Sequence, residues 1–114
     1  MWDRHPSGPR REAPERLPAD VVELTAARLR VLGKAKSIAL LDALRGGEAT
    51  VQDLADEVGL AHQNTSHHLA ALWREGIVSR RAEGPSTLYA LEDWGAWWVV
   101  EQIAGLVASP DEQE

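Results

Sequence analysis

The sequence predicts a mainly α-helical domain with one small β-hairpin, arranged as a winged helix-turn-helix of five helices plus a wing. Residues 50–76 have the spacing of two helices joined by a tight, glycine-containing turn. Residues 77–91 follow directly and have the apolar residues and Gly-Pro tip typical of a hairpin. A chain of 114 residues with 44% hydrophobic content is sufficient for one modest core.

The two ends of the chain differ in composition from the middle. Residues 1–17 are rich in proline, arginine and glutamate and show no periodicity, so we expect a flexible N-terminal arm. Residues 109–114 are expected to form a short acidic C-terminal tail. The remaining residues, 18–108, are expected to form one domain.

Two apolar helices are predicted at the start of this domain. The first should begin near residues 18–20 and end at Gly33, and its apolar coverage is wider than one stripe. A helix this apolar in a small domain usually buries a second face against a partner. The second helix is expected from about Lys36 to Arg45, and residues 49–50 are expected to form a minimal strand.

The helix-turn-helix prediction depends on its capping residues. Thr50 followed by Asp53 is a capping-box pattern, in which the threonine oxygen accepts a backbone N–H. Gly59 suits the left-handed position that ends the helix, and Leu60 fills the turn. Ala55 is small enough to let the two helices approach closely.

The next helix separates into an apolar side and a polar side. Thr65, Leu69 and Leu72 are expected to face inward. The residues expected to face outward are His62, Gln63, Asn64, Ser66 and His67. Gln and Asn form paired hydrogen bonds with adenine in the major groove. An ordinary solvated helix surface is the alternative, but such surfaces are usually filled with Lys and Glu, and neither occurs between Leu60 and Trp73. The pattern therefore predicts contacts with double-stranded DNA.

The residues after Gly76 are predicted to form two short strands around a turn at residues 83–86. A hairpin directly after a recognition helix is a wing. Arg80 and Arg81 lie on it, where we expect them to reach DNA phosphates or the minor groove.

The last helix is expected to run from the N-cap Asp93 to Val107 and is apolar nearly all round. Packing against the first helix of the same chain and of a second chain would bury it, so we predict a homodimer through the first and last helices. Trp94, Trp97 and Trp98 are interpreted as anchors in the dimer core. The alternative is that part of this cluster lines a pocket for an apolar or aromatic effector.

Composition excludes several classes of protein. The chain has no cysteine, which excludes disulfides and thiolate metal sites. It has no membrane-spanning apolar run and no signal peptide, so we expect a cytoplasmic protein without a membrane partner. No catalytic arrangement can be assembled, so we expect no enzyme. The net charge of −6 weakens a DNA-binding interpretation, although acids concentrate at residues 53–57, 92–93 and 111–114.

Beyond these patterns, the string TSHHLAALWREGIVSRRAEG, residues 65–84, resembles the ArsR/SmtB family of winged helix-turn-helix transcriptional regulators. The resemblance covers about residues 21–107 and includes the order of five helices and a wing. It implies a homodimer that binds a partly palindromic operator. Family members usually repress transcription and release DNA when a metal or another effector binds.

The chain departs from the family pattern at the usual metal-binding positions. Val51 and Asp53 occupy the positions of the family's two cysteines, and the last helix contains no histidine. Pro85 stands where the wing usually has a cation, and Thr65 where the family prefers an aliphatic residue. We therefore predict no usual metal site and no certain cofactor, and the operator, target genes and effector are not specified by the sequence.

Three alternatives remain open at this stage. One is a nickel- or zinc-type metal-responsive regulator with non-standard ligands, such as His5 with Asp3 and carboxylates of another segment. A transition-metal site made of His62, His67 and His68 is disfavoured, because their spacing does not align them on one helix face. The third is a winged helix used only for protein interaction.

Overall fold

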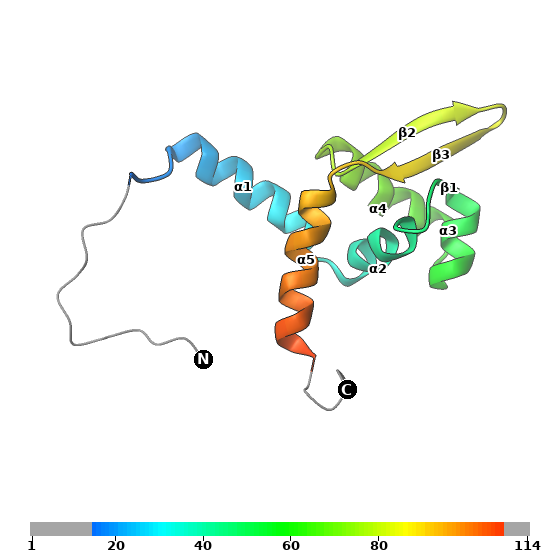
Figure 1. Ribbon diagram of the computed structural model, residues 1–114. Helices are drawn as coiled ribbons and strands as arrows, with labels where there is room; N and C mark the ends of the chain where they lie inside the picture. The colour runs from blue at the N-terminus through cyan, green and yellow to red at the C-terminus, as the bar shows by residue number, and fades with distance from the viewer. Residues whose placement is uncertain (1–14, 109–114) are drawn as a thin grey trace.

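The structure, a computed structural model, describes residues 15–108, and its element order is that of the predicted winged helix-turn-helix (Figure 1). The elements are α1 (Ala19–Leu32), α2 (Ala35–Leu44), β1 (Ala49–Thr50), α3 (Val51–Val58), α4 (His62–Arg74), β2 (Val78–Glu83), β3 (Ser86–Leu91) and α5 (Trp94–Val107). The fold class is therefore confirmed. Most of the predicted arm and all of the acidic tail, including Asp3 and His5, lie outside the described residues.

Both predicted boundaries of the second helix shift by one residue. The second helix begins at Ala35 and ends at Leu44, whereas the sequence predicted residues 36–45. The helix α4 begins at His62, because Ala61 has an extended backbone and acts as the N-cap. The other predicted elements, including the two-residue strand β1, occur where the sequence placed them.

The three strands form one antiparallel sheet in the order β1-β3-β2. The hairpin register pairs Val78 with Leu91 and Arg80 with Tyr89. The tip needs a left-handed backbone, which Gly84 supplies with a φ of 57°. β1 pairs with β3 through residues 49 and 50. This short pairing connects the hairpin to the segment that leads into α3.

The core lies where α2, α3 and α4 meet the sheet. The side chains that fill it are fully or nearly fully buried: Leu40, Leu41, Leu44, Leu54, Leu69, Leu72, Ile77, Val78 and Tyr89. Most of these side chains are leucines from three different helices, so each helix depends on the others for burial.

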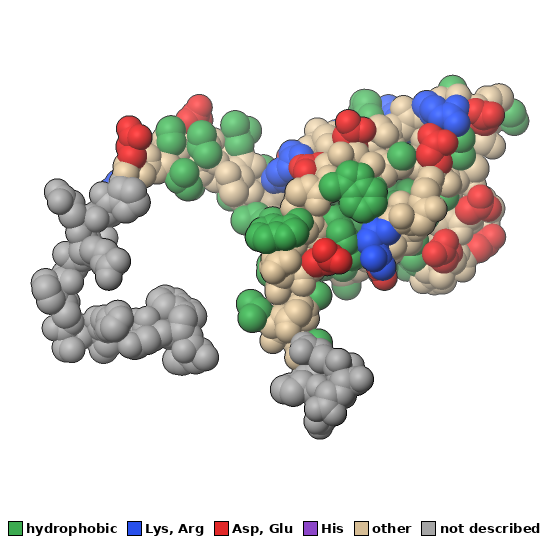
Figure 2. Space-filling model, viewed as in Figure 1, with side chains coloured by type: hydrophobic (Ala, Val, Ile, Leu, Met, Phe, Trp, Pro, Cys, Tyr) green, Lys and Arg blue, Asp and Glu red, His purple; other side chains and the backbone are tan. Residues whose placement is uncertain are grey.

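The helices α1 and α5 leave much of their apolar surface uncovered. In Figure 1, α1 projects away from the body, and Figure 2 shows hydrophobic side chains gathered along it and on α5. The exposed large side chains on these helices are Val21, Val22, Leu24, Leu29, Trp94, Trp98, Ile103, Leu106 and Val107. Within one chain, the two helices approach each other near residues 25–33 of α1. None of the helices in the described range has the length and hydrophobicity needed to cross a membrane.

Arg28 of α1 connects three helices. Its guanidinium donates one hydrogen bond to the backbone carbonyl of Glu75, at the end of α4, and another to Asp93 Oδ2, at 2.5 Å. Asp93 is also the N-cap of α5, because its Oδ1 accepts the N–H of Ala96 at 3.1 Å. The hydrogen bond from Arg28 is the main reason that the pKa of Asp93 is lowered.

This arrangement predicts how substitutions of Asp93 affect the stability of the fold. The variant Asp93→Asn keeps a side chain that can cap α5 but loses the charge, so we expect it to lower the free energy of unfolding by up to about 1 kcal/mol at neutral pH. Asp93→Ala also removes the cap and should cost about 1–2 kcal/mol. Denaturant unfolding at fixed protein concentration measures both values.

The pH dependence has a definite sign. Because the folded-state pKa of Asp93 is lowered, its contribution is complete above the unfolded value of 3.8 and is lost as pH falls through the folded value. The difference in free energy of unfolding between wild type and Asp93→Asn should therefore shrink as pH falls below 3.8 and through the folded-state pKa. A difference that stays constant from neutral pH to about pH 2 would contradict the role given to the ion pair.

Candidate nucleic-acid interface

The turn between α3 and α4 is held by local hydrogen bonds that the sequence predicts. The Thr50 hydroxyl accepts the N–H of Asp53 at 3.0 Å and caps α3. Gly59 has a φ of 74°, and the N–H groups of Gly59 and Leu60 both bond to the carbonyl of Ala55, at 2.9 and 3.0 Å. These bonds end α3 and direct the chain into α4.

The inner side of α4 is anchored by three fully buried side chains, Thr65, Leu69 and Leu72. Thr65 is polar where an aliphatic residue is usual in the resembling family, but its hydroxyl donates to the carbonyl of Ala61 at 3.0 Å. The hydrogen bond offsets the cost of burying the hydroxyl. Thr65 is therefore compatible with the core.

The outer side of α4 presents the predicted contact residues. His62, Gln63, Asn64 and His67 are exposed, and Ser66 is half-buried. Ala61 provides no side-chain cap for the start of α4. The backbone N–H groups at a helix start favour anions such as phosphates. Uncharged hydrogen-bonding groups thus lie beside a helix end that attracts negative charge.

The wing lies beside the start of the two helices. His62 shares a hollow with Thr50 and Gln52 of the helix-turn-helix and with Pro85 and Ser86 of the wing tip. The hollow brings the start of α4 and the tip of the hairpin together on one side of the molecule. His62 therefore lies at the rim of the outward face, between α4 and the wing.

Arg80 is held against the end of α4. Its guanidinium carbon lies 3.6 Å from the centroid of the Trp73 ring, which is the distance of a cation–π contact. The contact leaves both side chains exposed, and no acid is among the partners described for Arg80. Arg80 therefore keeps a positive charge beside α4.

Arg81 has a different environment from its neighbour. It makes two hydrogen bonds to the carboxylate of Glu48, at 2.8 and 3.0 Å, and one to Glu83 at 2.5 Å. The Arg81 guanidinium lowers the pKa of Glu48, and both carboxylates raise the pKa of Arg81. Two acids thus neutralise the charge of Arg81, and the two adjacent arginines of the wing are not equivalent.

Sequence reasoning missed a cluster at the start of α2. The Nδ1 atom of His68 lies 3.5 Å from the hydroxyl oxygen of Ser37, which is fully buried. Burial lowers the pKa of His68, and the positive charges of His67, Lys36 and Lys34 lower it further. The sequence shows Lys34 and Lys36 two residues apart, but only the packing of α2 against α4 places them near His68.

The histidines of α4 are not gathered around one point in the described part of the chain. The rings of His67 and His68 lie edge to face with centroids 5.6 Å apart. Within residues 15–108 there is no group of three or more His, Cys, Asp or Glu side chains that could hold a metal ion. The alternative based on His5 lies outside the described residues.

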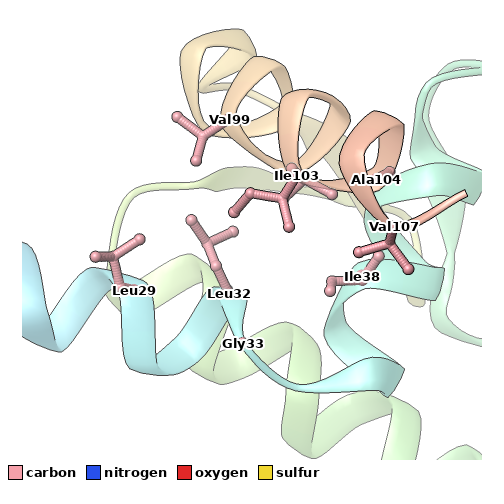
Figure 3. Close-up of a pocket in the computed structure, with 9 residues that line it drawn as sticks. Leu29, Leu32, Gly33, Ile38, Val99, Ile103, Ala104 and Val107 are labelled. Atoms are coloured by element: carbon pink, nitrogen blue, oxygen red, sulfur yellow. The ribbon is translucent and has the colours of Figure 1, made fainter. Parts of the chain in front are cut away.

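An apolar cavity of about 360 Å³ lies between α1 and α5. Figure 3 shows Leu29 and Leu32 from α1 facing Val99 and Ile103 from α5. Aliphatic side chains and glycine line this cavity, and none of the tryptophans within residues 15–108 does. Trp97 instead packs against the core, with the guanidinium of Arg45 5.0 Å from its ring centroid.

Comparison with known sequences finds one matching family. Residues 36–80, from α2 to the start of β2, match the family described as "Bacterial regulatory protein, arsR family". The chain is also similar to the HTH-type transcriptional regulator KmtR of Mycobacterium tuberculosis (strain ATCC 25618 / H37Rv). The two are 35% identical over 80 residues, which are 70% of this chain and 62% of KmtR. The chain thus spans less than two thirds of the length of this relative.

Two solved structures share the fold. The AntR antimony-specific transcriptional repressor has a TM-score of 0.76 and 25% identity, over 89% of this chain and 91% of that one. The homodimeric winged helix-turn-helix DNA-binding domain (fragment 1–100) of Mb0332 from Mycobacterium bovis is described as a possible ArsR-family regulator. It has a TM-score of 0.71 and 22% identity, over 85% of this chain and 90% of that one. This second likeness concerns the fold alone.

The environment of Arg81 gives a test of the wing geometry. We expect the carboxyl of Glu48 to titrate below its ordinary value of 4.5, because Arg81 stabilises the charged form. The variant Arg81→Ala should return it toward that value, whereas Arg80→Ala should leave it unchanged. Carbon-detected NMR titration of the side-chain carboxyls measures the pKa. An ordinary pKa for Glu48 in the wild-type chain would show that the ion pair does not form in solution.

Proposed function

We propose that this chain, which belongs to the arsR family of bacterial regulatory proteins, is a sequence-specific transcriptional regulator. We propose that it binds double-stranded DNA as a homodimer. One observation carries the proposal. Uncharged polar side chains between His62 and His67 face outward on the second helix of a helix-turn-helix, and a hairpin follows directly. Helices in this position enter the major groove, with residues of their N-terminal half near base edges.

Each outward residue has a role in this proposal. Gln63 and Asn64 have the paired donors and acceptors that read adenine, and Ser66 and His67 donate or accept hydrogen bonds at neighbouring bases. His62 lies at the rim, beside the wing. Arg80 contacts a phosphate, while Arg81 mainly holds the wing to Glu48 and contributes less to DNA affinity.

The acidic net charge is compatible with this role because of where the acids lie. The carboxylates of α3 include Asp53, Asp56 and Glu57, and all three are exposed. The α4 helix itself contains no acid between His62 and Arg74. Repulsion from the rest of the surface makes binding sensitive to salt, and it favours sites where base contacts add to phosphate contacts.

The homodimer is proposed to form through α1 and α5. Exposed apolar side chains on both helices, such as Leu24 at 68% and Trp98 at 60%, exceed what a monomer usually presents to water. The cavity between Leu32 and Ile103 offers a recess for side chains of a second copy. The Mb0332 domain, which has the same fold, is described as homodimeric. Two-fold symmetry then implies a partly palindromic operator with half-sites about 10 bp apart.

We assign both DNA binding and dimerisation to residues 18–108, with residues 1–17 and the acidic residues 109–114 outside this domain. A cytoplasmic location follows from a role on DNA. An effector that releases DNA is part of the proposal, and it is a small molecule or a metal. AntR is specific for antimony by its name, but this chain has no cysteine to provide soft thiolate ligands. A nickel- or zinc-type metal response would require His5 with carboxylates of another segment.

The first test concerns the homodimer. We expect sedimentation equilibrium at micromolar concentration to give twice the monomer mass of 12.5 kDa. Trp98→Glu or Ile103→Glu should weaken dimerisation by at least about 100-fold, because each places an unpaired charge in an apolar interface. Gln52→Glu adds the same charge on exposed α3 and serves as the matched control. A wild-type chain that sediments as a monomer would refute the dimer.

The second test concerns the recognition helix. An operator is first selected from a random DNA library, and binding is then measured by fluorescence anisotropy. Gln63→Ala and Ser66→Ala should each lose about 1–3 kcal/mol of discrimination between the operator and changed sequences. If both variants keep the full affinity and preference of wild type, the recognition helix is assigned wrongly. If no sequence is enriched, a winged helix used for protein interaction becomes the better interpretation.

The wing provides the control for this test. Arg80→Ala should weaken binding to all sequences alike and reduce the slope of affinity against salt by about one. Arg81→Ala removes the same charge from the next position, but we expect a smaller change in slope because Glu48 and Glu83 already neutralise it.

A further inference from the structure

A cluster of basic side chains lies where the start of α2 meets α4, beside the row proposed to read bases. Ser37, near the start of α2, contacts His68 of α4. Lys36 precedes Ser37 in the chain, and Lys34 is the N-cap of α2. Both lysines are exposed and act electrostatically on His68, which is half-buried. The start of α2 thus brings two lysines to His68, next to the outward face of α4.

We propose that Lys34, Lys36 and His68 form a binding site for a DNA backbone phosphate, and that DNA binding adds a proton to His68. This inference rests on the proposed function, because it identifies the ligand of the cluster as the backbone of bound DNA. It supplies sequence-independent attraction beside α4, which a chain with a net charge of −6 needs.

The hydroxyl of Ser37 lets His68 exist in two protonation states. A hydroxyl both donates and accepts hydrogen bonds. It donates to Nδ1 of the neutral ring, and it accepts from the Nδ1–H of the charged ring. The buried hydroxyl therefore keeps a hydrogen bond with His68 in both protonation states.

The charges around His68 favour the neutral ring in the free protein. Lys34 and Lys36 at the start of α2 and His67 of α4 all repel an added proton. Several charged groups of the other elements packed on α4 have different neighbours. Arg28 of α1 binds Glu75 and Asp93, Arg80 of β2 stacks on Trp73, Asp56 of α3 accepts from Gln52, and Glu57 lies beside the other end of α2.

An arriving phosphate reverses this balance. Its negative charge offsets the lysines, so the pKa of His68 rises in the complex and a proton is taken up. Because the complex then binds more protons than the free protein, affinity must increase as pH falls between the two pKa values. The free value lies below 6.5, so the increase should occur from about neutral pH into the mildly acidic range.

The test uses the full chain and a duplex of about 20 bp of arbitrary sequence at low salt, since phosphate contacts do not depend on sequence. NMR titration follows the His68 imidazole in the free protein, with the duplex, and with inorganic phosphate. We expect the duplex to raise the pKa of His68, and the affinity to increase several-fold from about pH 7.5 to about pH 6. His68→Gln should lose most of this pH dependence.

Exposed lysines provide a second variant that does not threaten folding. Lys34→Gln together with Lys36→Gln should lower affinity for the duplex and reduce the salt slope by about two. Arg45→Gln removes a cation from the other end of α2 and should leave the slope and the pH dependence unchanged.

The outcomes separate this inference from the proposed function. A duplex that binds without changing the His68 titration, together with an unchanged pH dependence in His68→Gln, overturns the phosphate site but leaves DNA binding intact. A shift with inorganic phosphate but none with the duplex overturns the assignment to DNA and identifies a free-anion site. If no duplex binds at any salt concentration, both proposals fail.

Discussion

The orientation of α4 depends on the burial of Leu69 and Leu72 among the leucines of α2 and α3. Successive residues of a helix point about 100° apart, so a rotation of α4 by one residue would expose these leucines and bury polar side chains. Each buried leucine contributes about 1.5–3 kcal/mol, which makes such a rotation costly. The hydrophobic core therefore determines which side chains of α4 face outward, although none of the core residues belongs to the candidate interface.

Electrostatic pairing then determines which charges remain available around α4. Arg81 and Arg80 are adjacent in sequence, yet one lies between two carboxylates and the other on an aromatic ring. The lysines at the start of α2 are exposed and lie beside α4. In an acidic chain, attraction for a polyanion depends on these local arrangements more than on the total charge.

The parts of the fold that could be predicted from the sequence are those with local signals. Thr50 before α3, Gly59 at the turn and Gly84 at the hairpin tip act through neighbouring residues, so a reader of the sequence can recognise them. The apolar pattern of α4 likewise predicts its buried and outward sides correctly.

The features that the sequence could not reveal join residues far apart in the chain. Arg28 and Asp93 are 65 residues apart, Arg81 and Glu48 are 33 apart, and Ser37 and His68 are 31 apart. No spacing rule connects such pairs, because the packing of helices and strands brings them together. For the same reason, α1 could be recognised as unusually apolar, but its projection from the body could not be foreseen.

The contact between Arg28 and α4 has a consequence for the evolution of the protein. Arg28 bonds to the backbone carbonyl of residue 75 and not to its side chain, and every amino acid supplies that carbonyl. Substitutions along the outer face of α4 therefore leave this attachment to α1 and α5 in place. In descendants of this chain, the outward residues of α4 can therefore change while the connection between the helices stays the same.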